Sequence, residues 1–203
     1  MDADAVEIRV LGCLIEKQRT TPDTYPLTLN ALRLACNQAT NREPVVEYDE
    51  ELIREALQRL WRKEWARLAS GQGSRSVKYR QLVQETLALA GDEISVLCVM
   101  MLRGPQTPGE LKQRSDRLHP FDELTEVEET LERLVARDLV ARLERRPGQK
   151  EERYAQLLGG DVDGADPVDV VRPVRAGDPL EERVAALEVE VAALRAALTD
   201  LGL

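Results

Sequence analysis

The chain has 203 residues, 43% of them hydrophobic, and a formal net charge of -9 at pH 7. This length and composition predict a folded globular protein with one large or two small domains, and they exclude a disordered chain. Acids equal or outnumber cations in each of the segments 1–86, 87–158 and 159–203. No segment is therefore a basic domain of the kind typical of nucleic-acid binding, and any such binding requires a local patch.

Cysteine usage and the amino terminus indicate the compartment. Cys13, Cys36 and Cys98 form no CxxC pair, and an odd number of cysteines fits poorly with a disulfide framework. The first residues, MDADAVEIRV, are acidic where a secretory signal carries cations, and no apolar run approaches the roughly 18 residues of a membrane span. We therefore expect a soluble cytoplasmic protein that makes no membrane contact.

Hydrophobic periodicity predicts three helices followed by a two-stranded hairpin in the first part of the chain. Helical stripes run through 6–17, 27–35 and 52–61, and the third stripe is the strongest. ARLAS (66–70) and SVKYRQL (76–82) then alternate with period two on either side of a glycine-containing loop. This pattern indicates a hairpin with a loop at its tip.

The same order of elements occurs twice. SVLCVMMLRGPQTP (95–108) matches RVLGCLIEKQRTTP (9–22) at an offset of 86, which brings the two Thr-Pro pairs into register. VEETLERL (127–134) matches IREALQRL (53–60) at an offset of 74, and LVARLER and ERYAQLL repeat the hairpin. The offsets differ by 12 residues, which we assign to the connection between the second and third helices of the first copy.

Local signals refine this repeat. Thr107-Pro-Gly-Glu110 and Thr125-Glu-Val-Glu128 have the pattern of capping boxes, and they predict two helix starts in the second copy. Trp61 and Trp65 align with apolar residues of the second copy. That alignment favours core packing over base stacking for both tryptophans.

Three helices followed by a two-stranded hairpin is the order of a winged helix, in which the hairpin is the wing. The predicted fold is mainly α with small β-hairpins (α+β), consisting of two tandem winged-helix domains and a C-terminal coiled-coil helix. The domains span 1–86 and 87–158, a Gly-, Asp- and Pro-rich linker spans 159–177, and the coiled-coil helix spans 178–203.

The C-terminal segment carries a heptad seam. Its Val and Leu choices favour a parallel two-stranded coiled coil, and Arg183 would face Glu188 of a second copy. We therefore expect a homo-oligomer, in the simplest case a dimer. A single helix lying on its own domains and a larger bundle are the alternatives. The seam consists of Leu180, Val184, Leu187, Val191, Leu194, Leu198 and Leu201.

Longer motifs support the fold. LGCLIEKQRTTPDTYPLTLNALRLACNQATNREPV, GSRSVKY and MLRGPQTPGEL resemble the YceH-like family of uncharacterised bacterial proteins. The similarity covers about 6–157, and the first motif is long and specific. The resemblance implies tandem winged helices and no established activity, so it supplies no catalytic or binding residues.

The sequence indicates no catalytic chemistry. His119 is the single histidine, and no HExxH motif or Cys/His cluster with zinc spacing is present. The cysteines lie among apolar residues at helical spacing, which favours buried packing over a nucleophile. We expect a non-enzymatic protein without cofactor or metal.

Cations on the first predicted wing are the main argument for DNA binding. Arg75, Lys78 and Arg80 lie in a segment without any acid. With Val77 and Tyr79 turned to the core, strand alternation predicts that Lys78 and Arg80 point outward together. Such a cluster could contact the phosphates of double-stranded DNA.

The second wing and the third helices weaken that argument. Arg145, Arg146 and Lys150 on the second wing are diluted by glutamates. The third helices begin YDEEL (48–52) and TEVEE (125–129), and carboxylates at these positions repel phosphates. Acids there are also explained as favourable partners of the helix dipole.

An amide-rich stretch, ACNQATNREP, lies in the predicted insertion. Asn37, Gln38, Asn41 and Arg42 are side-chain types that pair bidentately with base edges. In the alternative interpretation Asn37 ends the second helix in a left-handed turn, while Asn41 and Arg42 anchor the loop. We favour the structural role over base reading.

Two functions follow from these features. The first is a dimeric DNA-binding protein of transcription-regulator type that uses the first wing for phosphates and the amide-rich stretch for specificity. The second is an adaptor that uses winged helices as protein-docking surfaces, for which acidic third helices are no handicap. The sequence names neither the DNA sequence nor the partner protein.

Overall fold

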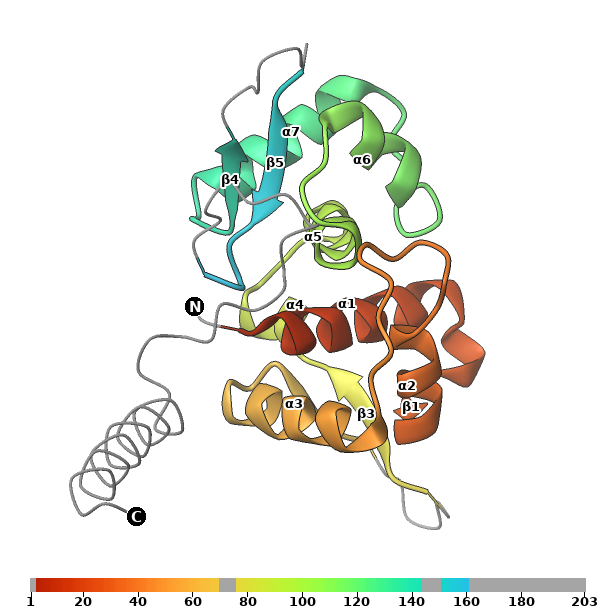
Figure 1. Ribbon diagram of the computed structural model, residues 1–203. Helices are drawn as coiled ribbons and strands as arrows, with labels where there is room; N and C mark the ends of the chain where they lie inside the picture. Colours follow the sequence, from red (N-terminus) through yellow and green to blue (C-terminus); the bar gives the residue numbers. More distant parts are fainter. Residues whose placement is uncertain (1–2, 70–75, 144–150, 161–203) are drawn as a thin grey trace, which may run out of the picture. The chain divides into compact units, whose positions relative to one another are not determined.

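The computed structural model describes residues 3–69, 76–143 and 151–160 (Figure 1). These residues form seven α-helices, a short 3-10 helix and two small antiparallel sheets, so the fold is mixed α and β. They all belong to one compact unit. We call residues 3–86 the first half and residues 87–160 the second half.

The first half holds three long helices and a three-stranded sheet. Asp4 caps the first helix through a capping box with Glu7, and Thr28 and Asp49 cap the next two. The elements are α1 (Ala5–Thr20), η1 (Pro22–Thr24), β1 (Leu27–Thr28), α2 (Leu29–Cys36), α3 (Glu50–Arg62), β2 (Ala66–Leu68), β3 (Lys78–Gln81) and α4 (Val83–Thr86).

The second half repeats this order with a smaller sheet. Its elements are α5 (Gly91–Arg103), α6 (Pro108–Ser115), α7 (Leu124–Val135), β4 (Val140–Leu143) and β5 (Arg153–Gln156). In the first sheet β3 lies between β1 and β2, and Leu27 pairs with Tyr79. The second sheet has β4 and β5 only, but an isolated bridge between Gln106 and Tyr154 takes the place of β1.

The halves share a backbone turn and a capping glutamate at the predicted offsets. Glu64 and Asp138, 74 residues apart, both adopt positive φ angles, of 59° and 53°, directly after the third helix. Glu7 and Glu93, 86 residues apart, are both buried N3 residues of capping boxes. These equivalences confirm the repeat that self-comparison of the sequence predicts.

The first helices of the two halves pack against each other at equivalent positions (Figure 1). Gly12 and Cys98 are 86 residues apart, and the Cys98 thiol donates to the Gly12 carbonyl at 3.3 Å. A Cβ on Gly12 would lie 2.9 Å from a methyl group of Leu102 and 3.1 Å from the Met101 Cβ. Gly12 therefore permits the close approach of α1 and α5.

The position of the 12 additional residues differs from the prediction. Thr28 and Thr107 are the N-caps of α2 and α6 and lie 79 residues apart, between the offsets of 86 and 74. Seven of the additional residues therefore precede α2 and five follow it. The Thr-Pro register is wrong, because Thr21-Pro22 begins η1 whereas Thr107-Pro108 begins α6. A capping sequence can start either kind of helix.

Four side-chain and boundary predictions are corrected. Trp61 is 66% exposed and Val77 51% exposed, so neither packs in the core, whereas Trp65 is buried. Helix α7 begins at Leu124 with Glu123 as N-cap, so Thr125 is not a cap. Asn37 ends α2 at a φ of -91° without a left-handed turn.

The predicted capping box at Thr107 is confirmed. Residues 161–177 of the predicted linker and the whole predicted coiled-coil helix, with its seam, lie outside the described residues.

Candidate functional site

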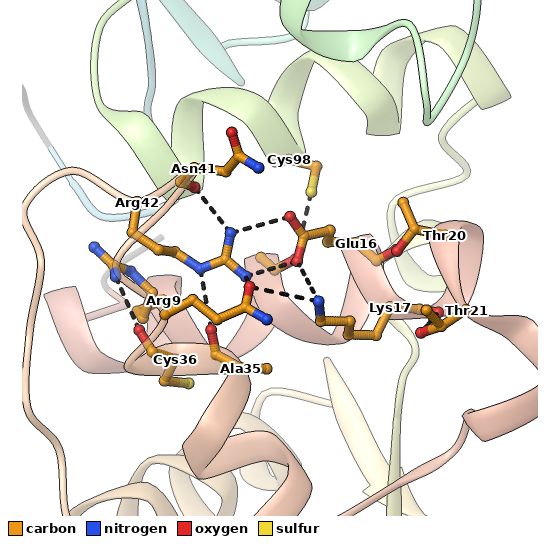
Figure 2. A network of polar contacts seen from close by, with 12 residues as sticks. Arg9, Glu16, Lys17, Thr20, Thr21, Ala35, Cys36, Asn41, Arg42 and Cys98 are labelled. Atoms are coloured by element: carbon orange, nitrogen blue, oxygen red, sulfur yellow. Dashed lines mark hydrogen bonds and ion pairs between the residues drawn. The ribbon is translucent and has the colours of Figure 1, made fainter.

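The stretch between α2 and α3, which we call the insertion loop (residues 37–49), is fastened by a buried arginine. Arg42 is 5% exposed, and its guanidinium contacts both carboxylate oxygens of Glu16 at 3.0 and 2.6 Å (Figure 2). It also donates to the carbonyls of Ala35 and Asn41. With the side chain of Gln38, five acceptor atoms thus fix one side chain beneath the loop.

The Arg42–Glu16 pair determines the protonation of both groups. Burial alone raises the pKa of Glu16, but the hydrogen bonds and charge of Arg42 outweigh it and hold that pKa below its usual value. Burial alone lowers the pKa of Arg42, and the bond to Glu16 raises it above its usual value. Both groups are therefore charged at neutral pH.

A second arginine holds the other side of the insertion loop. Arg9 is 4% exposed and donates to the Cys36 carbonyl at 3.1 Å and the Pro44 carbonyl at 2.6 Å. The loop also contacts α5, because the Glu43 amide donates to the Leu102 carbonyl at 2.8 Å. The insertion loop therefore links the two halves.

The amide side chains of the loop are engaged as well. The Asn37 side chain donates to the Tyr48 carbonyl at 2.8 Å and accepts from the Tyr48 amide at 2.9 Å. Gln38 accepts from Arg42 at 2.9 Å, and Asn41 accepts from Arg103. Of the four residues considered for base reading, Arg42 faces the interior, and the other three hold the loop in place. The arrangement supports the anchoring role for this stretch.

The hairpin cations are partly neutralised. Arg80 lies 3.3 Å from Glu85, and Lys78 is half-buried with no ion pair among the described residues. Arg67 is exposed and lies opposite Arg80 in the register of β2 and β3. Arg75 lies outside the described residues, as do Arg145, Arg146 and Lys150 of the second hairpin. Of the three cations of the first hairpin that were predicted to contact phosphates, Lys78 and Arg80 are described. Arg80 has a carboxylate 3.3 Å away.

A groove runs between α3 and the hairpin of the first half. It has a volume of about 450 Å³, and Trp61 and Leu68, 66% and 59% exposed, form its apolar rim. Its lining contains two arginines and no acid. The lining residues are Arg54, Leu57, Gln58, Trp61, Ala66, Arg67, Leu68 and Tyr79.

The arginines of the groove are not equivalent. Arg54 lies 2.5 Å from Glu51, one turn earlier on α3. Arg67 is exposed and forms no ion pair within the described part of the chain. Exposed apolar surface beside an unpaired cation is typical of a docking site.

Other kinds of site are not apparent in the part of the chain that the structure describes. No group of three or more His, Cys, Asp and Glu side chains is placed to hold a metal ion. Among the same residues no helix is both long and apolar enough to cross a membrane. The three cysteines are buried and unpaired, in line with the prediction of core packing.

Comparison with known proteins matches this sequence to one family. The family profile described as "Protein of unknown function, DUF480" covers residues 3–149. The chain belongs to the DUF480 family. It is 46% identical to the UPF0502 protein YceH of Salmonella newport over 204 residues, which cover 97% of this chain and 94% of that protein.

Two further DUF480 relatives are similarly close. A UPF0502 protein of Solibacter usitatus is 49% identical over 194 residues, covering 96% of this chain and 93% of the relative. A UPF0502 protein of Pelobacter propionicus is 48% identical over 206 residues, covering 96% and 94%. These names confirm the resemblance to the YceH-like family, and none of them states an activity.

Sequence reasoning missed the groove of this DUF480 protein. The signal was present, because Trp61 and Leu68 align with Val135 and Arg142 at the offset of 74. Because Trp61 aligns with the apolar Val135, the sequence predicted that Trp61 packs in the core. The exposed location became visible only when the orientation of α3 was known.

Proposed function

We propose that this protein is an adaptor built from two winged-helix units, and that the groove beside α3 of the first half binds a segment of a partner protein. The exposed Trp61 at the rim of the groove is the observation that carries the proposal. A tryptophan left two-thirds exposed loses hydrophobic free energy that a partner side chain would recover.

The chemistry of the groove indicates what the partner segment carries. Its apolar lining suits an aromatic or leucine side chain. Arg67, which forms no ion pair among the described residues, suits a carboxylate beside that anchor, whereas Arg54 is already paired with Glu51. The proposed occupant is therefore a segment with an apolar anchor flanked by Asp or Glu.

The test is selection of random peptides displayed on phage against the full chain. We expect enriched peptides with an apolar anchor beside acids, and Trp61→Ala should weaken the best synthetic peptide by roughly tenfold or more in calorimetric titration. Val135→Ala, at the equivalent position of the second half, is the matched control and should leave the Kd unchanged. Peptides without an acidic and apolar pattern, or peptides that bind Trp61→Ala equally well, would overturn the proposal.

Binding of double-stranded DNA is the second candidate, and the hairpin of the first half favours it. Arg67 and Arg80 lie directly opposite each other, and Glu85, 3.3 Å from Arg80, offsets part of their repulsion, which leaves Arg67 without an ion pair among the described residues. Against this, exposed Glu50, Glu51 and Glu55 of α3 would face the phosphates. The same carboxylates do not hinder the adaptor.

Fluorescence anisotropy with a random duplex separates the candidates. If DNA is bound, changing Arg75, Lys78 and Arg80 together to Ala should weaken binding to all sequences and flatten its salt slope by up to about three phosphate contacts. Trp61→Ala should have little effect in that assay. Absence of binding at about 50 mM salt would remove the DNA candidate.

Self-association through the heptad seam at 178–203 is part of the proposal. The alternating Val and Leu residues of this segment support a dimer that presents two grooves. A chain that ends at Gly177 should show a lower mass than the full chain in light scattering. An unchanged mass would contradict dimerisation by this segment.

A further inference from the structure

A second hollow lies where elements of both halves meet. It has a volume of about 480 Å³ and is bordered by α1, α5, α6 and the insertion loop. Three arginines line it, namely Arg103 at the end of α5, Arg114 on α6 and Arg117 just after α6. Asn41 reaches it from the insertion loop.

The acids around this hollow do not balance its arginines. Two acids line it, Glu16 and Asp116, and Glu16 is already paired with Arg42 at 2.6 Å and Lys17 at 3.3 Å. Arg114 is paired with Glu110, which lies outside the lining, so two arginines, Arg103 and Arg117, and one carboxylate, Asp116, form no ion pair among the described residues.

The three arginines differ in how they are held. Arg103 donates to the side chain of Asn41, and Arg114 donates to Gln106 and lies 3.3 Å from Glu110. These bonds fix two of the guanidinium groups at the wall of the hollow. Arg117 is exposed and makes no hydrogen bond or ion pair within the described ranges, so it is available to a ligand.

Electrostatics at Arg103 agree with an excess of positive charge. Burial lowers the pKa of Arg103, and the nearby charges of Arg114 and Arg42 lower it further. Glu43 and Glu16 raise the pKa, and the net shift is downward with burial as its largest cause. An anion in the hollow would relieve the repulsion among these arginines.

We propose that this hollow binds a small phosphorylated molecule. A phosphate ester carries between one and two negative charges near neutral pH, and the planar guanidinium group contacts its oxygens bidentately. The volume suits a ligand of metabolite size, and Val99, Leu102 and Leu118 supply an apolar wall for its remaining part.

The hollow is separate from the groove beside α3, so this inference does not depend on the adaptor function. A ligand bound there would contact the insertion loop of the first half and α6 of the second half at the same time. Binding should therefore strengthen the junction between the halves.

The test uses the full chain and pyrophosphate as the probe, in a buffer without phosphate and at constant ionic strength set with NaCl. We expect saturable heat of binding in calorimetry and a rise in the thermal unfolding midpoint with pyrophosphate concentration. Arg117→Gln should weaken binding by roughly tenfold, because it removes one charge-assisted contact without breaking a bond inside the protein. Arg103→Gln should weaken it by at least as much.

Arg62→Gln is the control, because Arg62 is an exposed arginine of α3 far from the lining of this hollow. It should leave the Kd for pyrophosphate unchanged. Three outcomes would overturn the proposal: no saturable binding at millimolar pyrophosphate, equal loss in Arg62→Gln and Arg117→Gln, or tighter binding of citrate than of pyrophosphate. The unfolding midpoint of each variant without ligand shows that it remains folded.

Discussion

The two halves share an ionic clamp but differ on the surface beside the third helix. In the first half Arg59 of α3 and Lys63, just after α3, contact the buried Glu7 of α1 at 3.6 and 2.6 Å. In the second half Arg133 of α7 and Arg137, just after α7, contact the buried Glu93 of α5 at 3.6 and 3.1 Å. The cations are 74 residues apart and the glutamates 86. The repeat thus preserves the contact that joins its first and third helices.

The outer faces have diverged. In the first half Leu68 pairs with Tyr79 and leaves a groove beside the exposed Trp61. In the second half Arg142 pairs with Tyr154, and its guanidinium carbon lies 5.6 Å from the centre of the tyrosine ring. The framework is therefore common to both halves, whereas the groove beside an exposed tryptophan and the longer insertion loop belong to the first.

The largest expected effect concerns the insertion loop, which is five residues longer than the equivalent connection of the second half. Arg42→Met and Glu16→Gln should each lower the free energy of unfolding by about 3 kcal/mol, because each leaves a buried charge without its partner. The double variant should lose less than the sum of the two, as urea unfolding would measure. Arg142→Met, which breaks the exposed pair with Glu152 at 3.4 Å, should cost less than about 1 kcal/mol. Equal losses in Arg42→Met and Arg142→Met would contradict the anchoring role.

The same pair predicts a pH dependence. The pKa of Glu16 is lower in the folded protein than in the unfolded chain. Its contribution is therefore present above the unfolded value of about 4.3 and is lost as pH falls through the folded value. The stability difference between wild type and Arg42→Met should be largest near neutral pH and should shrink below about pH 4.

The next effect concerns the helices that join the halves. Gly12→Val should lower the free energy of unfolding by about 2 kcal/mol, because α1 cannot accommodate a side chain against Leu102 and Met101. Gly109→Ala on α6 is the control. A Cβ there meets no atom within 4 Å, and alanine favours the helix, so stability should be unchanged or slightly higher. A neutral Gly12→Val would show that α1 and α5 do not pack this closely.

The smallest effect compares the two clamps directly. Glu7→Gln and Glu93→Gln should each cost about 1 to 2 kcal/mol, because each carboxylate is buried, accepts from one cation and from a helix N-cap amide, and lies 3.6 Å from a second cation. The measurement is the urea midpoint of each variant at constant slope. A clear difference between the two losses would mean that the clamps are not equivalent despite their shared geometry.

Much of the framework was predictable because its signals are local. The capping box at Thr107 and the strong stripe of α3 both follow from spacing along a few residues. The wrong alignment of Thr21-Pro22 with Thr107-Pro108 also arose from a local signal. A local capping pattern marks a helical turn, but it does not say whether the helix continues past three residues.

The candidate site was less predictable, because burial of a polar or aromatic side chain depends on distant partners. Arg42 is buried because Glu16 of α1 lies beneath the loop. Val77 is exposed because the strand begins only at Lys78, so alternation did not reach it. The arginines at the second hollow come from the end of α5 and the end of α6 and gave no motif.

The sequence by itself determined the repeat, the family, the mixed α and β elements and the three buried cysteines. The family follows from the resemblance of long motifs, and the other features depend on periodicity and capping, which act over one or two helical turns. The tertiary structure decided where Arg42 and Trp61 point, because their surroundings come from α1 and from the hairpin. Whether a side chain anchors a loop or faces a partner is fixed by packing between segments that are far apart in the chain.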